Sequence, residues 1–177
     1  MNLRRVSFLF LAMATCLTSA GWCQEAVTPG PEHKMLKELE GTWDATIKTE
    51  GQPASKGTAV YKMECGGLWL ISDFTGSFGD LKFQGRGTDG YDTDKKKFVA
   101  IWVDSMTSAP MVFEGTYDAK TKTQTMHGEG KGPDGKPAKY KNVTTTPDKD
   151  HQTFKMYVLG PDGKENLMMT IEYTRRK

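Results

Sequence analysis

The chain has 177 residues, of which 37% are hydrophobic and 26% are charged. This length and composition suit one globular domain with a sizeable core. The formal net charge is only +2, so a nucleic acid or an anionic membrane surface is not expected as a partner, because such binding rests on an excess of Lys and Arg.

Residues 1–23 are predicted to form a signal peptide. Arg4 and Arg5 precede an apolar segment, residues 6–17, that is too short to span a membrane. The segments around Cys16 and Cys23 do not suit a lipid anchor, and no other apolar run is long enough for a transmembrane helix. We therefore expect an exported, soluble protein that is either periplasmic or secreted.

Small residues allow cleavage after Cys23, which a polar segment follows, or otherwise after Ala20. Cleavage after Cys23 leaves 154 of the 177 residues and removes two of the 24 basic residues, so that 22 basic residues balance 22 acidic ones. Cys65 is then the one remaining cysteine, and no intramolecular disulfide can form; after Ala20, Cys23 would remain as a possible partner. Residues 24–32 are expected to be a linker and residues 33–177 a single domain.

A short helix is predicted at the start of this domain. Pro31 suits the first turn of a helix, and Met35, Leu36 and Leu39 share one face. Gly41 is a plausible end to this helix.

From Gly41 onward, the sequence changes to a period of two, which is typical of strands. Trp43, Ala45 and Ile47 alternate with polar residues, and similar segments of about eight residues follow to the end, separated by turn residues. The segment GPDGK occurs at 132–136 and again at 160–164, where Pro and Gly favour tight turns. Short connections exclude a parallel sheet. The pattern predicts an all-β fold, an antiparallel up-and-down β-barrel of about ten strands.

The segment Gly41-Thr42-Trp43 resembles the start of lipocalin-type calycin barrels. In those barrels the Trp closes one end and stacks under an Arg of the last strand, so the resemblance implies a contact between Trp43 and Arg175. Five longer segments extend the resemblance to one bacterial family of unknown function, numbered 1579: HKMLKELEGTWDATIKTEG, GRGTDGYDTDKKKFVAIWVDSM, VFEGTYDAKTKT, FKMYVLGPDGKE and MMTIEYTR. This resemblance covers residues 33–176 and implies a calycin-like barrel, but no reaction.

The inward side chains of such a barrel are the best candidates for a binding site. Alternation places aromatic and methionine residues on the inner face, and ten strands can enclose a small apolar or amphipathic ligand. The predicted ligand-binding residues are Tyr61, Trp102, Asp104, Glu114, Met126, Met156, Met169 and Tyr173. The alternative is that the same residues fill the barrel as packed core.

Asp104 and Glu114 are the carboxylates of greatest interest, because they lie in consecutive predicted strands. If both faced inward, they could orient a ligand or act as an acid–base pair. Asp104 could instead cap the following turn, and Glu114 could pair with a lysine outside.

Histidine and cysteine chemistry finds little support. His33, His127 and His151 have no second ligand at metal-binding spacing, and we expect them to be solvent-exposed. No nucleophile motif is present, and Cys65 is expected to be buried on the inner face and unreactive. We expect no catalytic residue, metal or cofactor.

Three functions remain open at this point. The first is a non-catalytic binding protein for a small ligand in the lumen, the second is a filled-barrel interaction protein of the cell envelope, and the third is a carboxylate-based enzyme. A closed barrel needs no partner strand, so a monomer is expected.

Overall fold

The computed structural model describes residues 26–78, 81–132 and 134–177. The predicted signal peptide, residues 1–23, and both predicted cleavage sites lie outside the described residues. Within the described ranges, no helix is both long and apolar enough to cross a membrane.

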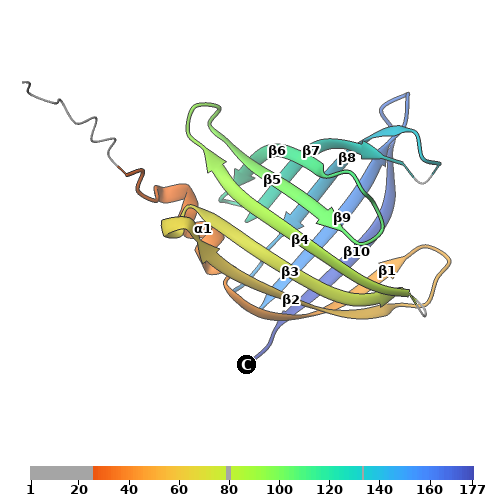
Figure 1. Cartoon of the computed structure of the whole chain (residues 1–177), viewed down its shortest axis with the longest axis horizontal. Coiled ribbons are helices and arrows are strands. Elements are labelled where there is room, and N and C mark those ends of the chain that lie inside the picture. The colour runs from red at the N-terminus through yellow and green to blue at the C-terminus, as the bar shows by residue number, and fades with distance from the viewer. Residues whose placement is uncertain (1–25, 79–80, 133) are drawn as a thin grey trace, which may run out of the picture.

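Ten strands in the described part of the chain form a closed antiparallel barrel (Figure 1). Each strand pairs with its neighbours along the chain, and the first strand pairs with the last, which confirms the predicted up-and-down barrel. The strands are β1 (Gly41–Thr49), β2 (Ser55–Glu64), β3 (Trp69–Phe78), β4 (Leu81–Asp92), β5 (Lys97–Asp104), β6 (Met111–Asp118), β7 (Thr123–Lys131), β8 (Pro137–Thr145), β9 (His151–Leu159) and β10 (Glu165–Arg175).

The seam between β1 and β10 closes the barrel through apolar side chains. Ala45 pairs with Tyr173, and Ile47 pairs with Ile171. All four are buried in one cluster with Trp43. Because neighbouring residues on a strand point to opposite faces, this register brings the apolar positions of both strands to the interior.

The described residues of the two GPDGK segments make equivalent hairpin turns, in which Gly135 donates a hydrogen bond to the carbonyl of Gly132 and Gly163 to that of Gly160, each at 2.9 Å. Gly135 and Gly163 have φ values of +77° and +78°, a left-handed conformation that favours glycine. In both turns the Asp side chain accepts a hydrogen bond from a backbone N–H two residues later: Lys136 donates to Asp134, and Lys164 donates to Asp162. The repeat is therefore reused turn chemistry.

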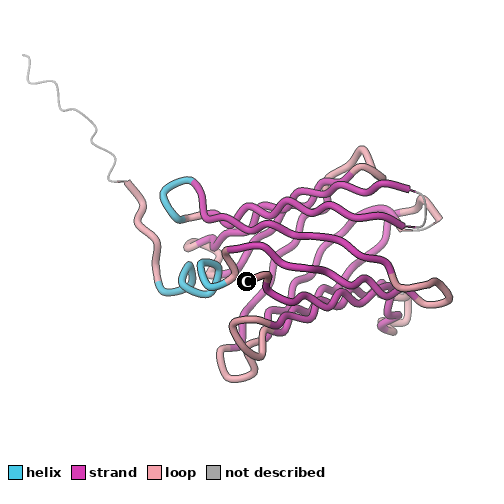
Figure 2. The backbone as a smooth tube through the Cα atoms, turned by 90° about the horizontal axis from the view of Figure 1, so that it is seen from below, coloured by secondary structure: helices cyan, strands magenta, loops and turns pink. Residues whose placement is uncertain are grey.

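Helix α1 (Pro31–Glu38) lies at one end of the barrel, beside β2, β3 and β4 (Figures 1 and 2). Leu36 and Leu39 are buried in one cluster with Leu70 and Phe98. The helix begins at Pro31, so the last two residues of the predicted linker are helical.

The sequence predicted that His33 would be solvent-exposed, and this prediction is wrong. It is buried, and its Nδ1 accepts a hydrogen bond from the backbone N–H of Gly30 at 3.0 Å. Its ring also meets Tyr91 edge-on, with 6.4 Å between the ring centroids. His33 thus caps the start of α1. His127 and His151 are exposed, as predicted.

Cys65 is exposed, which contradicts the buried position predicted for it. Strand β2 ends at Glu64, and Cys65 begins a 3₁₀ turn (Cys65–Gly67) with a φ of +50°. Gly66 and Gly67 also have positive φ. The chain therefore leaves the strand one residue before Cys65 would have turned inward.

Candidate binding cavity

The barrel encloses a cavity of about 360 Å³. All ten described strands contribute to its wall, together with Leu36 of α1 and Met106 of the β5–β6 loop. This volume lies in the range of pockets for small organic molecules. The lumen is thus not a completely filled core.

The cavity wall is mainly apolar and rich in methionine. Methionine side chains are flexible and polarisable, so they adapt to irregular apolar shapes. The six that line the cavity are Met106, Met111, Met126, Met156, Met168 and Met169.

Seven of the eight predicted ligand-binding residues line the cavity. They are Tyr61, Trp102, Asp104, Met126, Met156, Met169 and Tyr173. Alternation predicted the inward orientation of those on β2, β7, β9 and β10, whereas it left the face of Asp104 open. Their role in binding a ligand stays a prediction.

Glu114 is the exception: it does not line the cavity, so its assignment as a ligand-binding residue is wrong, and the alternative of a lysine partner outside the barrel is the one that the structure shows. Phe113 and Gly115 of β6 are buried, so Glu114 between them points outward. It pairs there with Lys95 and, at 3.3 Å, with Lys97. The hydrogen bond from Lys95 lowers the pKa of the Glu114 carboxyl. Asp104 and Glu114 lie on opposite faces of the wall and form no acid–base pair.

Asp104 caps the turn that follows it, which is one of the alternatives that the sequence left open, and it also lines the cavity. Its Oδ2 accepts a hydrogen bond from Trp102 Nε1 at 2.9 Å, inside the barrel. Its Oδ1 accepts hydrogen bonds from the backbone N–H groups of Met106 at 2.8 Å and Thr107 at 3.1 Å. Asp104 thus holds both the Trp102 indole and the first turn of the β5–β6 loop.

Inward glycines let large side chains lie flat against the wall. A Cβ atom on Gly85 would stand 2.1 Å from the Trp102 ring, so that position requires glycine. Phe113 lies over Gly128 in the same way, and Met126 lies over Gly115. A strand glycine marks this kind of close approach. Because these large side chains lie along the wall, they leave space in the centre of the lumen.

Asp89 of β4 is a cavity residue that sequence reasoning missed. It lines the cavity, and within the described residues its carboxyl group has neither a hydrogen bond nor an ion pair. Burial raises the pKa of Asp89 to about 7. The signal was present, because Asp89 lies six residues after the apolar Phe83 on the same strand, so both share a face, and both line the cavity.

Tyr61 lies near Asp89, and Tyr173 lies beside Tyr61. Burial is the main cause that raises the pKa of Tyr61 well above its usual range, and the neighbouring Tyr173 and Asp89 add to the effect. Burial also raises the pKa of Tyr173. Both hydroxyls therefore stay neutral across the physiological pH range and can donate or accept hydrogen bonds.

Amide side chains form a second polar region of the wall, on β7 and β8. Gln124 and Asn142 line the cavity near Thr144, which pairs with Gln124 across the strands. Gln124 Nε2 and Asn142 Oδ1 are buried without a hydrogen-bond partner in the described part of the chain. Unpaired buried polar groups are costly unless a ligand or water satisfies them.

The cavity reaches the surface near the β5–β6 loop. Met106 lines the cavity, yet 62% of its surface is exposed. The pairing of β5 with β6 ends at Trp102 and Met111, so Asp104 has no partner on β6. The strands part here, beside Met106.

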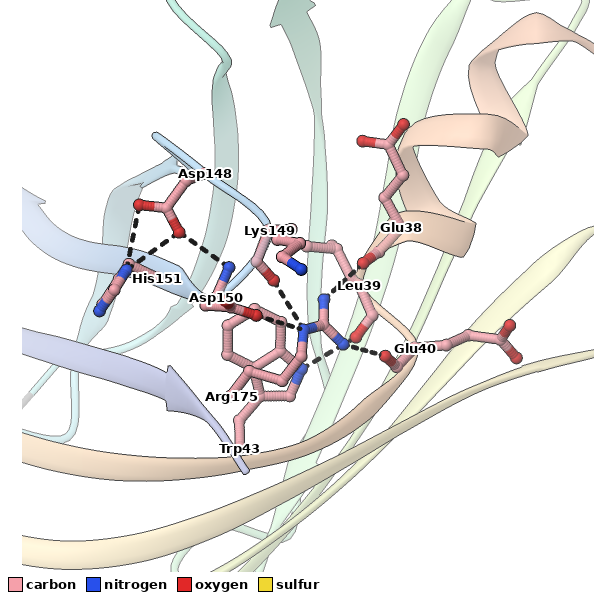
Figure 3. Close-up of polar contacts among 9 residues, drawn as sticks. All are labelled: Glu38, Leu39, Glu40, Trp43, Asp148, Lys149, Asp150, His151 and Arg175. Atoms are coloured by element: carbon pink, nitrogen blue, oxygen red, sulfur yellow. Dashed lines mark hydrogen bonds and ion pairs between the residues drawn. The ribbon is translucent and has the colours of Figure 1, made fainter. Parts of the chain in front are cut away.

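The opposite end is closed by Trp43 and Arg175 (Figure 3). The Arg175 guanidinium lies 4.1 Å from the centre of the Trp43 ring, which is the contact that the resemblance implied. It donates hydrogen bonds to the carbonyl oxygens of Glu38 at 2.6 Å, of Glu40, and of Lys149 at 2.6 Å.

Gly41 and Trp43 complete this closed end. A Cβ atom on Gly41 would stand 2.9 Å from Arg175 Nη1, and the φ of Gly41 is +127°. Trp43 Nε1 donates a hydrogen bond to the carbonyl of Leu39 at 2.9 Å. The Gly-x-Trp motif therefore joins the end of α1 to the last strand.

A second hollow lies on the outer face of β1–β4. It is lined partly by polar side chains, among them Asp44, Lys56 and Thr58. These groups are already paired, since Lys56 bonds to Thr46 at 2.7 Å and Asp44 pairs with Arg176. We regard the lumen as the candidate site.

Metal binding has no geometric support in the described residues, where no group of three or more His, Cys, Asp or Glu side chains is placed to hold an ion.

Comparison with protein families gives one match. The family described as "Protein of unknown function (DUF1579)" matches residues 28–175. A search of curated proteins finds no match.

Solved structures with the same fold are distant in sequence. Rv2717c from M. tuberculosis is 13% identical, with a TM-score of 0.60; the match covers 84% of this chain and 99% of that one. The S-type phycobiliprotein lyase CPES from Guillardia theta is 12% identical, with a TM-score of 0.56; that match covers 82% and 93%. At these identities, the likeness supports the barrel fold alone.

Proposed function

This chain belongs to the DUF1579 family, and we propose that it is a non-catalytic binding protein that holds a small apolar or amphipathic molecule in its barrel. The observation that carries this proposal is the cavity of about 360 Å³, with its methionine-rich wall and unpaired polar groups. One end of the barrel is closed by Trp43 and Arg175, and the other opens beside Met106. Such a cavity suits a ligand that is mostly buried and oriented by a few polar contacts.

We further propose that the protein acts after export. The basis is the predicted signal peptide in residues 1–23, with cleavage after Cys23 or otherwise after Ala20. An exported carrier would shield an apolar ligand from water in the periplasm or outside the cell. We also propose that it acts as a monomer, because the closed barrel leaves no strand edge for a partner.

A second candidate function is that of an interaction protein. Its support is an apolar patch on the outer face of β5 and β6, where Ile101, Val103 and Val112 are 46%, 46% and 52% exposed. Patches of this kind often mark protein contacts. The cavity is not needed for this function, so blocking the lumen would leave it unchanged.

An acid–base enzyme is a third candidate, and Asp89 favours it. A carboxyl group with a pKa near 7 could accept or donate a proton at neutral pH. However, the other carboxyl group among the described lining residues, Asp104, is engaged by Trp102 and the loop.

The proposed function is tested by filling the lumen. Met126→Trp should place a large ring in the cavity and abolish binding of the neutral fluorescent probe N-phenyl-1-naphthylamine. His127→Trp is the matched control, because the neighbouring side chain is exposed on the outer face. Circular dichroism should show both variants folded. Equal probe binding by the wild type and both variants would contradict the proposal.

A further inference from the structure

The charged groups of the cavity are all acidic. Asp89 and Asp104 line it, whereas none of the described lining residues is Lys, Arg or His. A ligand with a carboxylate or phosphate group would therefore meet no cation in the described wall. A fatty acid, the obvious apolar ligand for a barrel, is disfavoured on this ground.

Only one of the two carboxyl groups is available to a ligand. Both oxygens of Asp104 already accept hydrogen bonds, from Trp102, Met106 and Thr107. The carboxyl group of Asp89 has no such partner within the described residues. It lies beside Gly87, where a Cβ atom would stand only 3.5 Å from Asp89 Oδ2.

Groups around Asp89 suit a positively charged partner. Tyr61 of β2 lies near Asp89, and Tyr173 of β10 lies beside Tyr61; both offer hydroxyl oxygens as acceptors and aromatic rings for a cation. On β3, Ser72 faces the same space, and on β5 the residue opposite Asp89 is the small Ala100. From α1, Leu36 supplies an apolar contact. No described lining group would repel a cation.

We propose that the cavity selects an apolar molecule that carries a protonated amine, and that this amine pairs with Asp89 while the apolar part contacts the methionines. This inference rests on the proposed binding function and names the chemical class of the ligand. A charged hydrogen bond in an apolar site contributes enough binding free energy to discriminate between ligands of equal size.

The proposal also implies a dependence on pH. The amine binds best when Asp89 is ionised, so affinity for the amine should rise as the pH increases through about 7. Asp104 and the two tyrosines share the cavity with Asp89, but the tyrosines stay neutral in this range. A neutral ligand should bind equally at all these pH values.

The test compares three probes with one alkyl chain, namely decylamine, decanol and decanoate, as competitors of N-phenyl-1-naphthylamine at a pH of about 8. We expect decylamine to bind at least about tenfold more tightly than decanol, and decanoate to bind most weakly. Asp89→Asn should remove the preference for the amine and leave decanol unaffected. Asp73→Asn, an exposed carboxylate on β3, is the control for general charge.

The outcomes separate this inference from the proposed function. If N-phenyl-1-naphthylamine and decanol bind but decylamine has no advantage, or decanoate is tightest, the amine proposal is overturned and the binding function stands. If none of the probes binds, both the amine proposal and the proposed binding function are overturned. A preference for decylamine that persists in Asp89→Asn would also overturn the assignment of Asp89.

Discussion

Asp89 lies in the cavity wall and couples the folded state to pH. Its pKa is about 7 in the folded protein, because burial disfavours the charged form, against about 4 in an unfolded chain. The folded state therefore holds a proton that the unfolded state has lost over this range. Stability from Asp89 is fully present below a pH of about 4 and is lost as the pH rises through about 7.

This linkage gives a measurable prediction for Asp89→Asn. The free energy of unfolding of the wild type, minus that of the variant, should fall by about 1 kcal/mol per pH unit between about pH 4 and pH 7, then stay constant. Urea unfolding at a series of pH values measures it. Carboxylates with lowered pKa values, such as Asp44 and Asp118, affect both proteins equally and cancel. A difference that does not change with pH would show that Asp89 is solvated.

At the residue scale, the sequence predicts the orientation of side chains in the middle of a strand, where alternation sets it. It does not predict the orientation of side chains at the end of a strand, where the exact end point sets it. Met126 and Tyr173 lie within long strands, so their inward orientation could be predicted. Cys65 lies where a strand stops, and one residue of difference in that end moved the thiol to the surface. Glu114 lies in a strand that is apolar on both faces, so its pattern could not show which face is inside.

At the scale of elements, Arg175 joins three parts of the chain. Its guanidinium contacts Trp43 of β1 and bonds to carbonyl groups at the end of α1 and in the β8–β9 turn (Figure 3). Several donors in one rigid plane are needed for this arrangement, and only Arg supplies them. The last strand, the first strand and the helix are thus held by one side chain.

Arg175→Lys should therefore be destabilising, by about 1–3 kcal/mol, because lysine cannot reproduce the forked hydrogen bonds or the stacking. Arg176→Lys is the matched control at the next position, since Arg176 is exposed and pairs with Asp44 on the surface. Urea unfolding of both variants gives the comparison. Equal stability of the two variants would mean that the closed end contributes little to the fold.

The elements themselves were predictable to a large extent. Period-two alternation, the two GPDGK turns and the Gly-x-Trp motif together indicated an up-and-down barrel with a short leading helix, and the structure confirms this. Turn residues such as Gly135 and Gly163 act locally, so their effect can be read without the tertiary structure.

At the scale of the whole molecule, the sequence could not distinguish a filled lumen from a cavity. That difference depends on how large side chains lie relative to glycines on neighbouring strands, as Trp102 does over Gly85. The free carboxyl group of Asp89 likewise emerges only when the whole wall is assembled. The interior is thus built by contacts between strands that no single segment contains.

The most direct test of the central claim is a methyl NMR titration of protein labelled with ¹³C-methyl methionine, using decanol as a neutral ligand. Six methionines line the cavity, whereas Met35 and Met63 do not line it and pack, partly buried, against the core. We predict that decanol shifts signals of the cavity methionines, including the deep Met126 and Met156, and leaves Met35 and Met63 unchanged. No shift at saturating decanol, or shifts at the exposed Met106 alone, would contradict a ligand-binding lumen.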